Sequence, residues 1–237
     1  MSVTKRYGHL TALSGVSFSI RPGEILGLIG PNGSGKTTLF ECLGGVLPAD
    51  SGTLAGPDRP LSRRERAATV FYLPDGIAPW PSQPLGWVID FTIGFFGGRE
   101  ELRQEVVRRL GLELLVDSPL GTLSKGQRKR ALLAIGLLAP HPVLLADEPF
   151  DGLDLRQTRE VAQTLRHYAA AGRTMLLSIH QISDAARVCD RFVLLSNGRS
   201  CAEGTIEELS ALAAARGVLA ARSAASASLE EIFLALT

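Results

Sequence analysis

The order of apolar and polar residues along the chain predicts buried strands that alternate with amphipathic helices. Short apolar runs bounded by turn residues are typical of strands buried on both faces, and they lie at 25–29, 68–73, 143–146 and 174–179. Stretches with helical periodicity lie at 36–47, 129–139, 155–171, 205–215 and 228–236. This alternation predicts an α/β fold with a mostly parallel sheet.

Three further segments complete this outline. Residues 16–20 alternate apolar and polar, as a half-buried strand does, and Asn197-Gly198 is a strong hairpin signal. We therefore expect a small antiparallel β subdomain. The Pro-rich start, apolar centre and helical end of residues 76–122 predict helices inserted into the core.

The chain is expected to form one domain, 1–237, with three parts. An α/β core takes 1–75 and 140–204, a helical subdomain takes 76–139, and a helical tail takes 205–237. A length of 237 residues suits one large domain with a subdomain.

Composition narrows the class of protein. The chain is 45% hydrophobic and 21% charged, with a net charge of +1, so no basic surface points to a nucleic-acid partner. No apolar run is long enough to span a membrane, and the polar start predicts no signal peptide. The three cysteines lack metal-ligand spacing and indicate a reducing compartment. We therefore expect a cytoplasmic protein whose membrane role, if it has one, runs through a partner.

The strongest chemical signal follows the first buried strand. The stretch GPNGSGKTT matches the phosphate-binding P-loop, and it stands between a predicted strand and a predicted helix. Its candidate phosphate-binding residues are Gly30, Pro31, Asn32, Gly33, Ser34, Gly35, Lys36, Thr37 and Thr38. The glycines allow backbone N–H groups to point at an anion, Lys36 reaches the outer phosphates, and the Thr37 hydroxyl is suited to hold Mg²⁺. The chain has only four lysines, and one of them stands at this position.

A second signal lies at the end of the strand 143–146. The strand delivers Asp147 and Glu148 to the edge of the sheet where open α/β folds bind ligands. Asp147 is then a natural Mg²⁺ partner, and Glu148 is placed to polarise a water for attack on the γ-phosphate. The alternative is a solvated Asp-Glu pair that only ends the strand.

With these motifs the chain resembles the ATP-binding-cassette (ABC) ATPases over nearly its whole length. The segment LSKGQ, 123–127, is similar to that family's signature motif and precedes the Asp-Glu strand by the usual interval. The resemblance implies that Tyr7 stacks on the adenine of ATP, and that His180 contacts the γ-phosphate. It makes Glu148, His180 and Lys36 the expected catalytic residues.

The resemblance also implies a dimer, expected to be a homodimer, that sandwiches two ATP molecules. Each subunit would offer Ser124, Lys125, Gly126 and Gln127 to the partner's nucleotide, and Asp154 belongs to the loop that crosses to the partner. The helix start at Ser124 is itself an anion site. Read locally, Ser124 is also a plain helix N-cap, and the two interpretations are compatible.

Two features depart from the family pattern, and a third indicates one branch of the family. The family usually has Gln where this chain has Asp75, so Asp75 either takes over that residue's contact with Mg²⁺ or water, or serves the turn Pro74-Asp75-Gly76. Only six residues precede Tyr7, so the first edge strand is expected to be short or missing. The tail Ser228–Phe233 is similar to the ending of exporter ATPase subunits.

The leading hypothesis is an ATPase subunit that powers an exporter through a separate membrane permease. One alternative is a soluble ABC-type ATPase that acts on ribosomes or DNA, and another is a regulatory subunit without turnover. We expect the permease to dock near Trp80, an aromatic residue in a Pro-rich segment. The alternative for Trp80 is packing onto its own subdomain.

Overall fold

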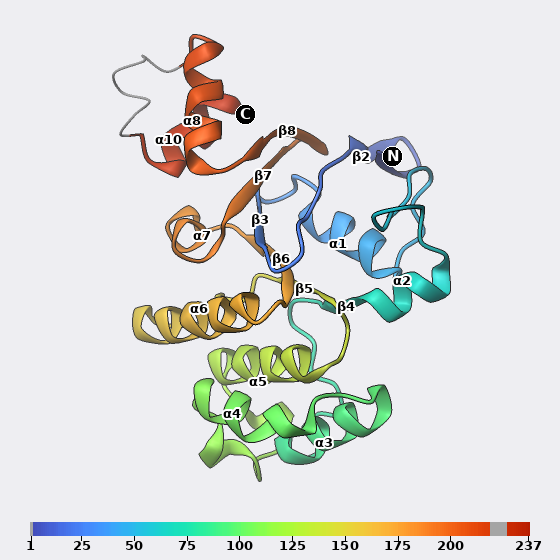
Figure 1. The fold of residues 1–237 in the computed structure, drawn as a ribbon, viewed down its shortest axis with the longest axis vertical. Coiled ribbons are helices and arrows are strands. Elements are labelled where there is room, and N and C mark those ends of the chain that lie inside the picture. Colours follow the sequence, from blue (N-terminus) through green and yellow to red (C-terminus); the bar gives the residue numbers. More distant parts are fainter. Residues whose placement is uncertain (1, 219–226) are drawn as a thin grey trace.

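The computed structural model describes residues 2–218 and 227–237 (Figure 1). Its main sheet has six strands in the order β4-β5-β6-β3-β7-β8, parallel except for the β7–β8 hairpin, and β1 and β2 form a separate antiparallel pair. The strands are β1 Val3–Tyr7, β2 Leu10–Val16, β3 Ile25–Ile29, β4 Val70–Leu73, β5 Val143–Asp147, β6 Thr174–Ile179, β7 Arg191–Ser196 and β8 Arg199–Gly204. The expected α/β class is confirmed.

Strand β3 lies at the centre of the sheet because its side chains are apolar on both faces. Ile25 and Ile29 belong to the hydrophobic cluster on one face, and Leu26 and Leu28 belong to the cluster on the other. This alternation follows from the two-residue period of a strand. The segment that follows β3 is therefore fixed at the middle of the molecule.

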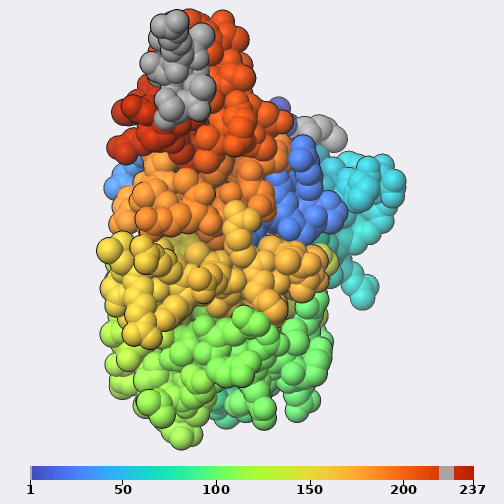
Figure 2. Space-filling view, turned by 60° about the vertical axis from the view of Figure 1, so that its left-hand side comes forward, coloured from blue at the N-terminus to red at the C-terminus, as the bar shows by residue number. Residues whose placement is uncertain are grey.

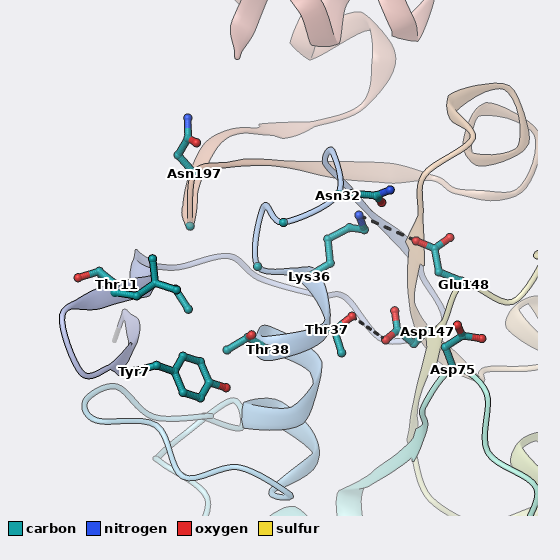
Figure 3. Close-up of a pocket in the computed structure, with 15 residues that line it drawn as sticks. Tyr7, Thr11, Asn32, Lys36, Thr37, Thr38, Asp75, Asp147, Glu148 and Asn197 are labelled. Atoms are coloured by element: carbon teal, nitrogen blue, oxygen red, sulfur yellow. Dashed lines mark hydrogen bonds and ion pairs between the residues drawn. The ribbon is translucent and has the colours of Figure 1, made fainter.

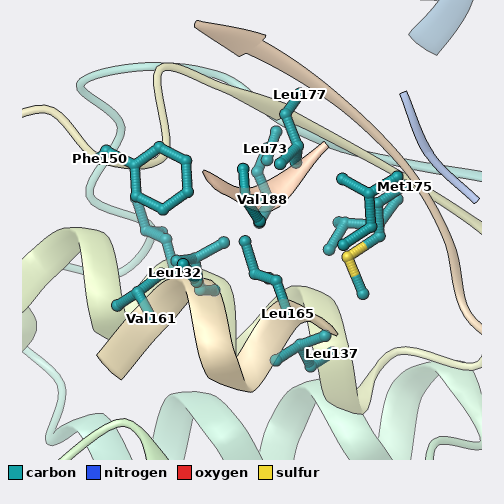
Figure 4. Packing of buried hydrophobic residues seen from close by; sticks show 14 of the residues in the cluster. Leu73, Leu132, Leu137, Phe150, Val161, Leu165, Met175, Leu177 and Val188 are labelled. Carbon is teal, nitrogen blue, oxygen red and sulfur yellow. The ribbon is translucent and has the colours of Figure 1, made fainter. Parts of the chain in front are cut away.

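Helices cover both faces of the sheet. The helices of the described residues are α1 Lys36–Gly44, α2 Arg63–Thr69, α3 Leu85–Phe96, α4 Arg103–Arg109, α5 Lys125–Leu138, α6 Leu155–Ala170, α7 Ile182–Val188, α8 Ile206–Ala215 and α10 Leu229–Leu236, with single 3₁₀ turns at Glu100–Leu102, Glu113–Leu115 and Leu120–Thr122. On one face Leu132 of α5, Leu165 of α6 and Val188 of α7 converge with Met175 of β6 (Figure 4). The other face is covered by α1 and the β1–β2 pair.

The long axis of the molecule ends in two helical groups. Helices α3 and α4 pack on α5 at one end, and α8 packs on α10 at the other (Figure 1). The space-filling view shows the same order, with the sheet region between the two groups (Figure 2).

The structure corrects two expected boundaries and shows that the first strand is present. Residues 17–20 lie outside any strand, and β2 ends at Val16. The apolar run at 68–73 begins inside α2, which Ser62 caps together with Glu65, so β4 starts only at Val70. The first strand, expected to be short or missing, is present as five residues paired with β2.

Candidate functional site

A pocket of about 570 Å³ opens at the carboxyl ends of β3 and β5, and Figure 3 shows its walls. Fifteen residues line it: Tyr7, Leu10, Thr11, Ala12, Asn32, Gly33, Gly35, Lys36, Thr37, Thr38, Asp75, Asp147, Glu148, Asn197 and Gly198. Ten of these were predicted from the sequence, and they come from four separate parts of the chain: Tyr7, the segment 32–38, Asp75, and the pair Asp147 and Glu148. The pocket lies at the carboxyl ends of the strands, which is where open α/β sheets bind ligands.

The loop from Gly30 to Gly35 joins β3 to α1 and forms the floor of the pocket. Gly33 and Gly35 have φ angles of +80° and +104°, in the left-handed region that favours glycine, and Gly35 is the N-cap of α1. Gly30 has a different reason to be glycine, because a Cβ there would lie 2.4 Å from the Leu195 carbonyl oxygen. The loop therefore aims the start of α1 at the pocket, which favours an anion there.

Lys36 lies on this floor and is buried. Its Nζ donates to the carbonyl oxygens of Gly30 at 2.7 Å and Pro31 at 3.3 Å, and it lies 3.9 Å from Glu148 Oε1. Burial lowers the pKa of Lys36, and the nearby carboxylates of Glu148 and Asp147 oppose that shift. The ammonium thus stands between the loop and the acidic wall of the pocket.

Asp147 joins that wall to the P-loop helix. Its Oδ2 accepts a hydrogen bond from Thr37 Oγ1 at 3.1 Å, and its Oδ1 accepts one from the Ser178 hydroxyl of the neighbouring strand β6. Hydroxyl and carboxylate oxygens are the hard donors that Mg²⁺ prefers, so Thr37 and Asp147 fit that ion. Ser178 was not predicted, and its only sequence signal is its position on a strand beside β5.

Glu148 follows directly and has an unusual backbone. Its φ is +48°, a rare conformation for a side chain of this size, and its N–H donates to Ser178 Oγ at 3.0 Å. Its Oε2 lies 3.2 Å from Nδ1 of His180. His180 does not line the pocket, yet the structure brings it to the predicted base, and strained residues of this kind cluster at functional sites.

The opposite end of the pocket is formed by Tyr7 and the β7–β8 turn. Tyr7 ends β1 and is 46% exposed, with Lys5 Nζ 5.6 Å from its ring centroid, so part of the ring remains accessible to a flat ligand. The turn at Asn197 and Gly198 braces the P-loop, since the Gly198 N–H donates to the Ser34 carbonyl oxygen at 3.0 Å. The Asn197-Gly198 pair predicted a hairpin turn here, but the contact of this turn with the P-loop was not predicted.

The predicted signature residues lie outside the pocket within one chain. Ser124 caps α5 in a capping box with Gln127, and Asp154 caps α6 in the same way. Lys125 pairs with Asp151 at 2.6 Å. The local N-cap interpretation of Ser124 therefore describes the single chain, in which these residues do not meet the P-loop.

Asp75 lies two residues past β4 and does line the pocket, beside Asp147 and Glu148 (Figure 3). Its Oδ1 accepts a hydrogen bond from Nζ of Lys129 at 2.6 Å. Among the described residues its side-chain partner is therefore on α5, not in its own turn. Lys129 was not predicted as a site residue.

A row of aromatic residues lies on the outer face of α3, outside the pocket. Trp87, Phe91 and Phe95 stack at four-residue intervals, and the Trp80 ring packs 4.8 Å from that of Phe91. We call these four residues the aromatic row. Their exposed fractions run from 38% to 70%, so Trp80 both packs on α3 and remains accessible. Only Trp80 was predicted, although the spacing of the others signals one helix face.

Among the residues that the structure describes, no helix combines the length and the apolar character that a membrane crossing requires.

Comparison with known proteins agrees with this geometry. The family model described as "ABC transporter" matches residues 13–151. Nod factor export ATP-binding protein I of Ralstonia nicotianae is 35% identical over 86% of this chain and 66% of its own length, and that of Burkholderia orbicola is 35% identical over 86% and 69%. The solved structure of an ATP binding subunit of an ABC transporter superposes with a TM-score of 0.85 at 27% identity, covering 99% of this chain and 97% of that one.

The chain spans about two thirds of the length of these export relatives. The expected P-loop class is confirmed, and a soluble ATPase acting on ribosomes or DNA is not favoured. The chain belongs to the ABC transporter family, as one of its ATP-binding ATPase subunits.

Proposed function

We propose that this subunit uses the pocket of Figure 3 to hydrolyse ATP, and that it thereby powers export through a separate membrane permease. The observation that carries the proposal is the position of Glu148, with one carboxylate oxygen 3.9 Å from Lys36 Nζ and the other 3.2 Å from His180. A carboxylate so placed is able to take a proton from water at the phosphate end of the pocket.

In this proposal the two ends of the pocket bind different parts of ATP. Tyr7 stacks on the adenine, and the backbone N–H groups of the P-loop hold the phosphates at the start of α1. Lys36 exchanges its carbonyl partners for phosphate oxygens. The bound nucleotide lies across the pocket from the β1 end to Asp147.

Thr37 and Asp147 would hold Mg²⁺, with the Asp75 carboxylate as a further oxygen ligand nearby. When bound, Mg²⁺ neutralises charge on the β- and γ-phosphates. The Asp147 carboxylate is already oriented for this role by Thr37 and Ser178.

Hydrolysis follows from the residues at the acidic wall. Water attacks the γ-phosphorus, the bond to the leaving oxygen of ADP breaks, and Glu148 takes the proton of the water. His180 orients Glu148 and contacts the γ-phosphate, while Lys36 stabilises the charge that develops on the transferred group.

Export is supported by the relatives and by the tail of the chain. The two relatives reported above are named for Nod factor export. Ser228–Phe233 forms the cap and the start of α10, at the place of the exporter-like ending expected from the sequence. The substrate of this chain's permease is a separate matter, because a permease chooses its own cargo.

The aromatic row is the proposed permease contact. Trp80 has a φ of +48°, and a bulky residue in that region is held there by its surroundings. The row exposes three large rings on α3 and the ring of Trp80 beside them, and exposed apolar patches mark interaction sites. Docking there would hold the subunit at the cytoplasmic face of the membrane, with no nucleic acid involved.

The experiment is steady-state phosphate release by the purified chain with Mg-ATP. Wild type should hydrolyse ATP, and Glu148→Gln should lose about a hundred-fold or more in rate while still binding ATP, because the charge of the base is removed and the phosphate cradle remains. The matched control is Glu160→Gln, a partly exposed carboxylate on α6 that pairs with Arg156. Equal rates for Glu148→Gln and wild type would contradict the assignment.

A further inference from the structure

Lys129 is a buried lysine with a specific pair of acceptors. Its side chain is 7% exposed, and its Nζ donates to Asp75 Oδ1 at 2.6 Å and to the Asp147 carbonyl oxygen at 3.1 Å. A buried ammonium is expensive unless it is paired and hydrogen-bonded. Both acceptors stand at the ends of adjacent parallel strands, since Leu73 of β4 is in register with Ala146 of β5.

The ion pair of Lys129 and Asp75 lies at the wall of the nucleotide pocket. Three carboxylates line the acidic wall, those of Asp75, Asp147 and Glu148, whereas Lys36 is the single lysine or arginine among the described lining residues. A triphosphate carries several negative charges, and an unpaired carboxylate in the wall would repel it. Asp75 stands where the family usually has a neutral glutamine, so this chain places one more negative charge there.

We propose that Lys129 is a positioning residue that holds the Asp75 carboxylate at the wall of the nucleotide pocket and neutralises it. Asp75 thereby offers an oxygen ligand beside Asp147 without adding net charge to the wall. Lys129 acts from behind the wall, because it touches the carboxylate and the strand end but does not line the pocket. The inference rests on the ATP site proposed above.

The pairing predicts that a change of either residue alone is costly. Loss of Lys129 leaves the Asp75 carboxylate facing the phosphates, and loss of the Asp75 charge leaves a buried ammonium with only a carbonyl acceptor. Removing both charges together restores a neutral wall. Coupling between two sites of this kind is what a double-mutant cycle measures.

The test is a binding cycle with a fluorescent ATP analogue in wild type, Lys129→Gln, Asp75→Gln and the double variant, with Mg²⁺ and with EDTA in its place. Lys129→Gln should weaken binding about ten-fold, and more in EDTA, because Mg²⁺ screens the unpaired carboxylate. In the Asp75→Gln background the same change should weaken binding less than about three-fold. The control is Arg130→Gln, whose guanidinium binds carbonyl oxygens at Leu110 and Gly111 on the far side of α5.

Other outcomes are decisive as well. A loss of affinity in Lys129→Gln that Asp75→Gln leaves unchanged, or that is the same with and without Mg²⁺, would overturn the proposal in favour of a purely structural brace on Asp147. If Lys129→Gln fails to fold, a folded double variant that binds nucleotide supports the pair, and an unfolded one overturns it. A wild-type chain that binds no nucleotide would instead contradict the ATP site itself.

Discussion

At the scale of single residues, the site is built from side chains that already have partners. Lys36 is held by two carbonyl oxygens of its own loop, and Asp147 by the hydroxyls of Thr37 and Ser178. These partners hold each side chain at the pocket, where an arriving phosphate would replace the carbonyl partners of Lys36. Asp75 likewise has a partner, Lys129. This ion pair makes an aspartate compatible with a phosphate site at the position where the family usually has glutamine.

Lys36→Ala should weaken ATP binding about ten- to hundred-fold, because a charge-assisted hydrogen bond to phosphate is worth about 1.5–3 kcal/mol. The measurement is titration with a fluorescent ATP analogue. Since Lys36 also bonds two loop carbonyls, a thermal melt without nucleotide shows whether the fold itself suffers. Unchanged affinity in a folded variant would contradict the proposed phosphate contact.

At the scale of elements, α3 is unusual because it is apolar on both faces. Its inner face buries Leu85, Val88 and Ile89, and its outer face carries most of the aromatic row. A helix that is hydrophobic all round is normally covered on all sides. The structure covers only the inner face of α3, which favours a partner protein on the other.

Phe95→Ser tests this surface with little risk to the fold, since Phe95 is 70% exposed. The variant should keep wild-type ATPase activity as a soluble chain and lose co-purification with the permease, because it removes a large apolar contact from the docking surface. Leu234→Ser is a matched control, as Leu234 is 71% exposed on α10 at the other end of the molecule. Retention of the permease by Phe95→Ser, or equal loss in both variants, would contradict docking on the aromatic row.

The sequence predicted elements best where burial is continuous. Strands β3, β5 and β6 are apolar on both faces, so each is recognisable in the sequence as a short apolar run. Strand β6 spans the residues expected. Helix α2 was missed because none of its residues is buried, and only the Ser62 and Glu65 capping box signals it. Within the site, local motifs identified the P-loop and Asp147, whereas Lys129 becomes meaningful only through Asp75, 54 residues away.

At the scale of the whole molecule, one chain holds a pocket and a separate helix start that do not meet. The pocket gathers the P-loop, Asp147 and Glu148, while Ser124 stands at the start of α5 outside it. A helix start favours an anion, and the family resemblance implies that this one meets the nucleotide of a second subunit. Two copies facing each other would complete two sites at once, which is the usual closure of a symmetric dimer.

Glu148→Gln should therefore form a dimer at saturating Mg-ATP, because ATP persists between the subunits when hydrolysis is blocked. Light scattering on a sizing column should give about twice the chain mass of 25.3 kDa with ATP, and the chain mass without it. Adding Ser124→Asp tests the contact itself. Aspartate is a good N-cap, so α5 stays capped, but its charge repels the partner's γ-phosphate. The double variant should stay monomeric, and a dimer as stable as that of Glu148→Gln would place the dimer contact elsewhere.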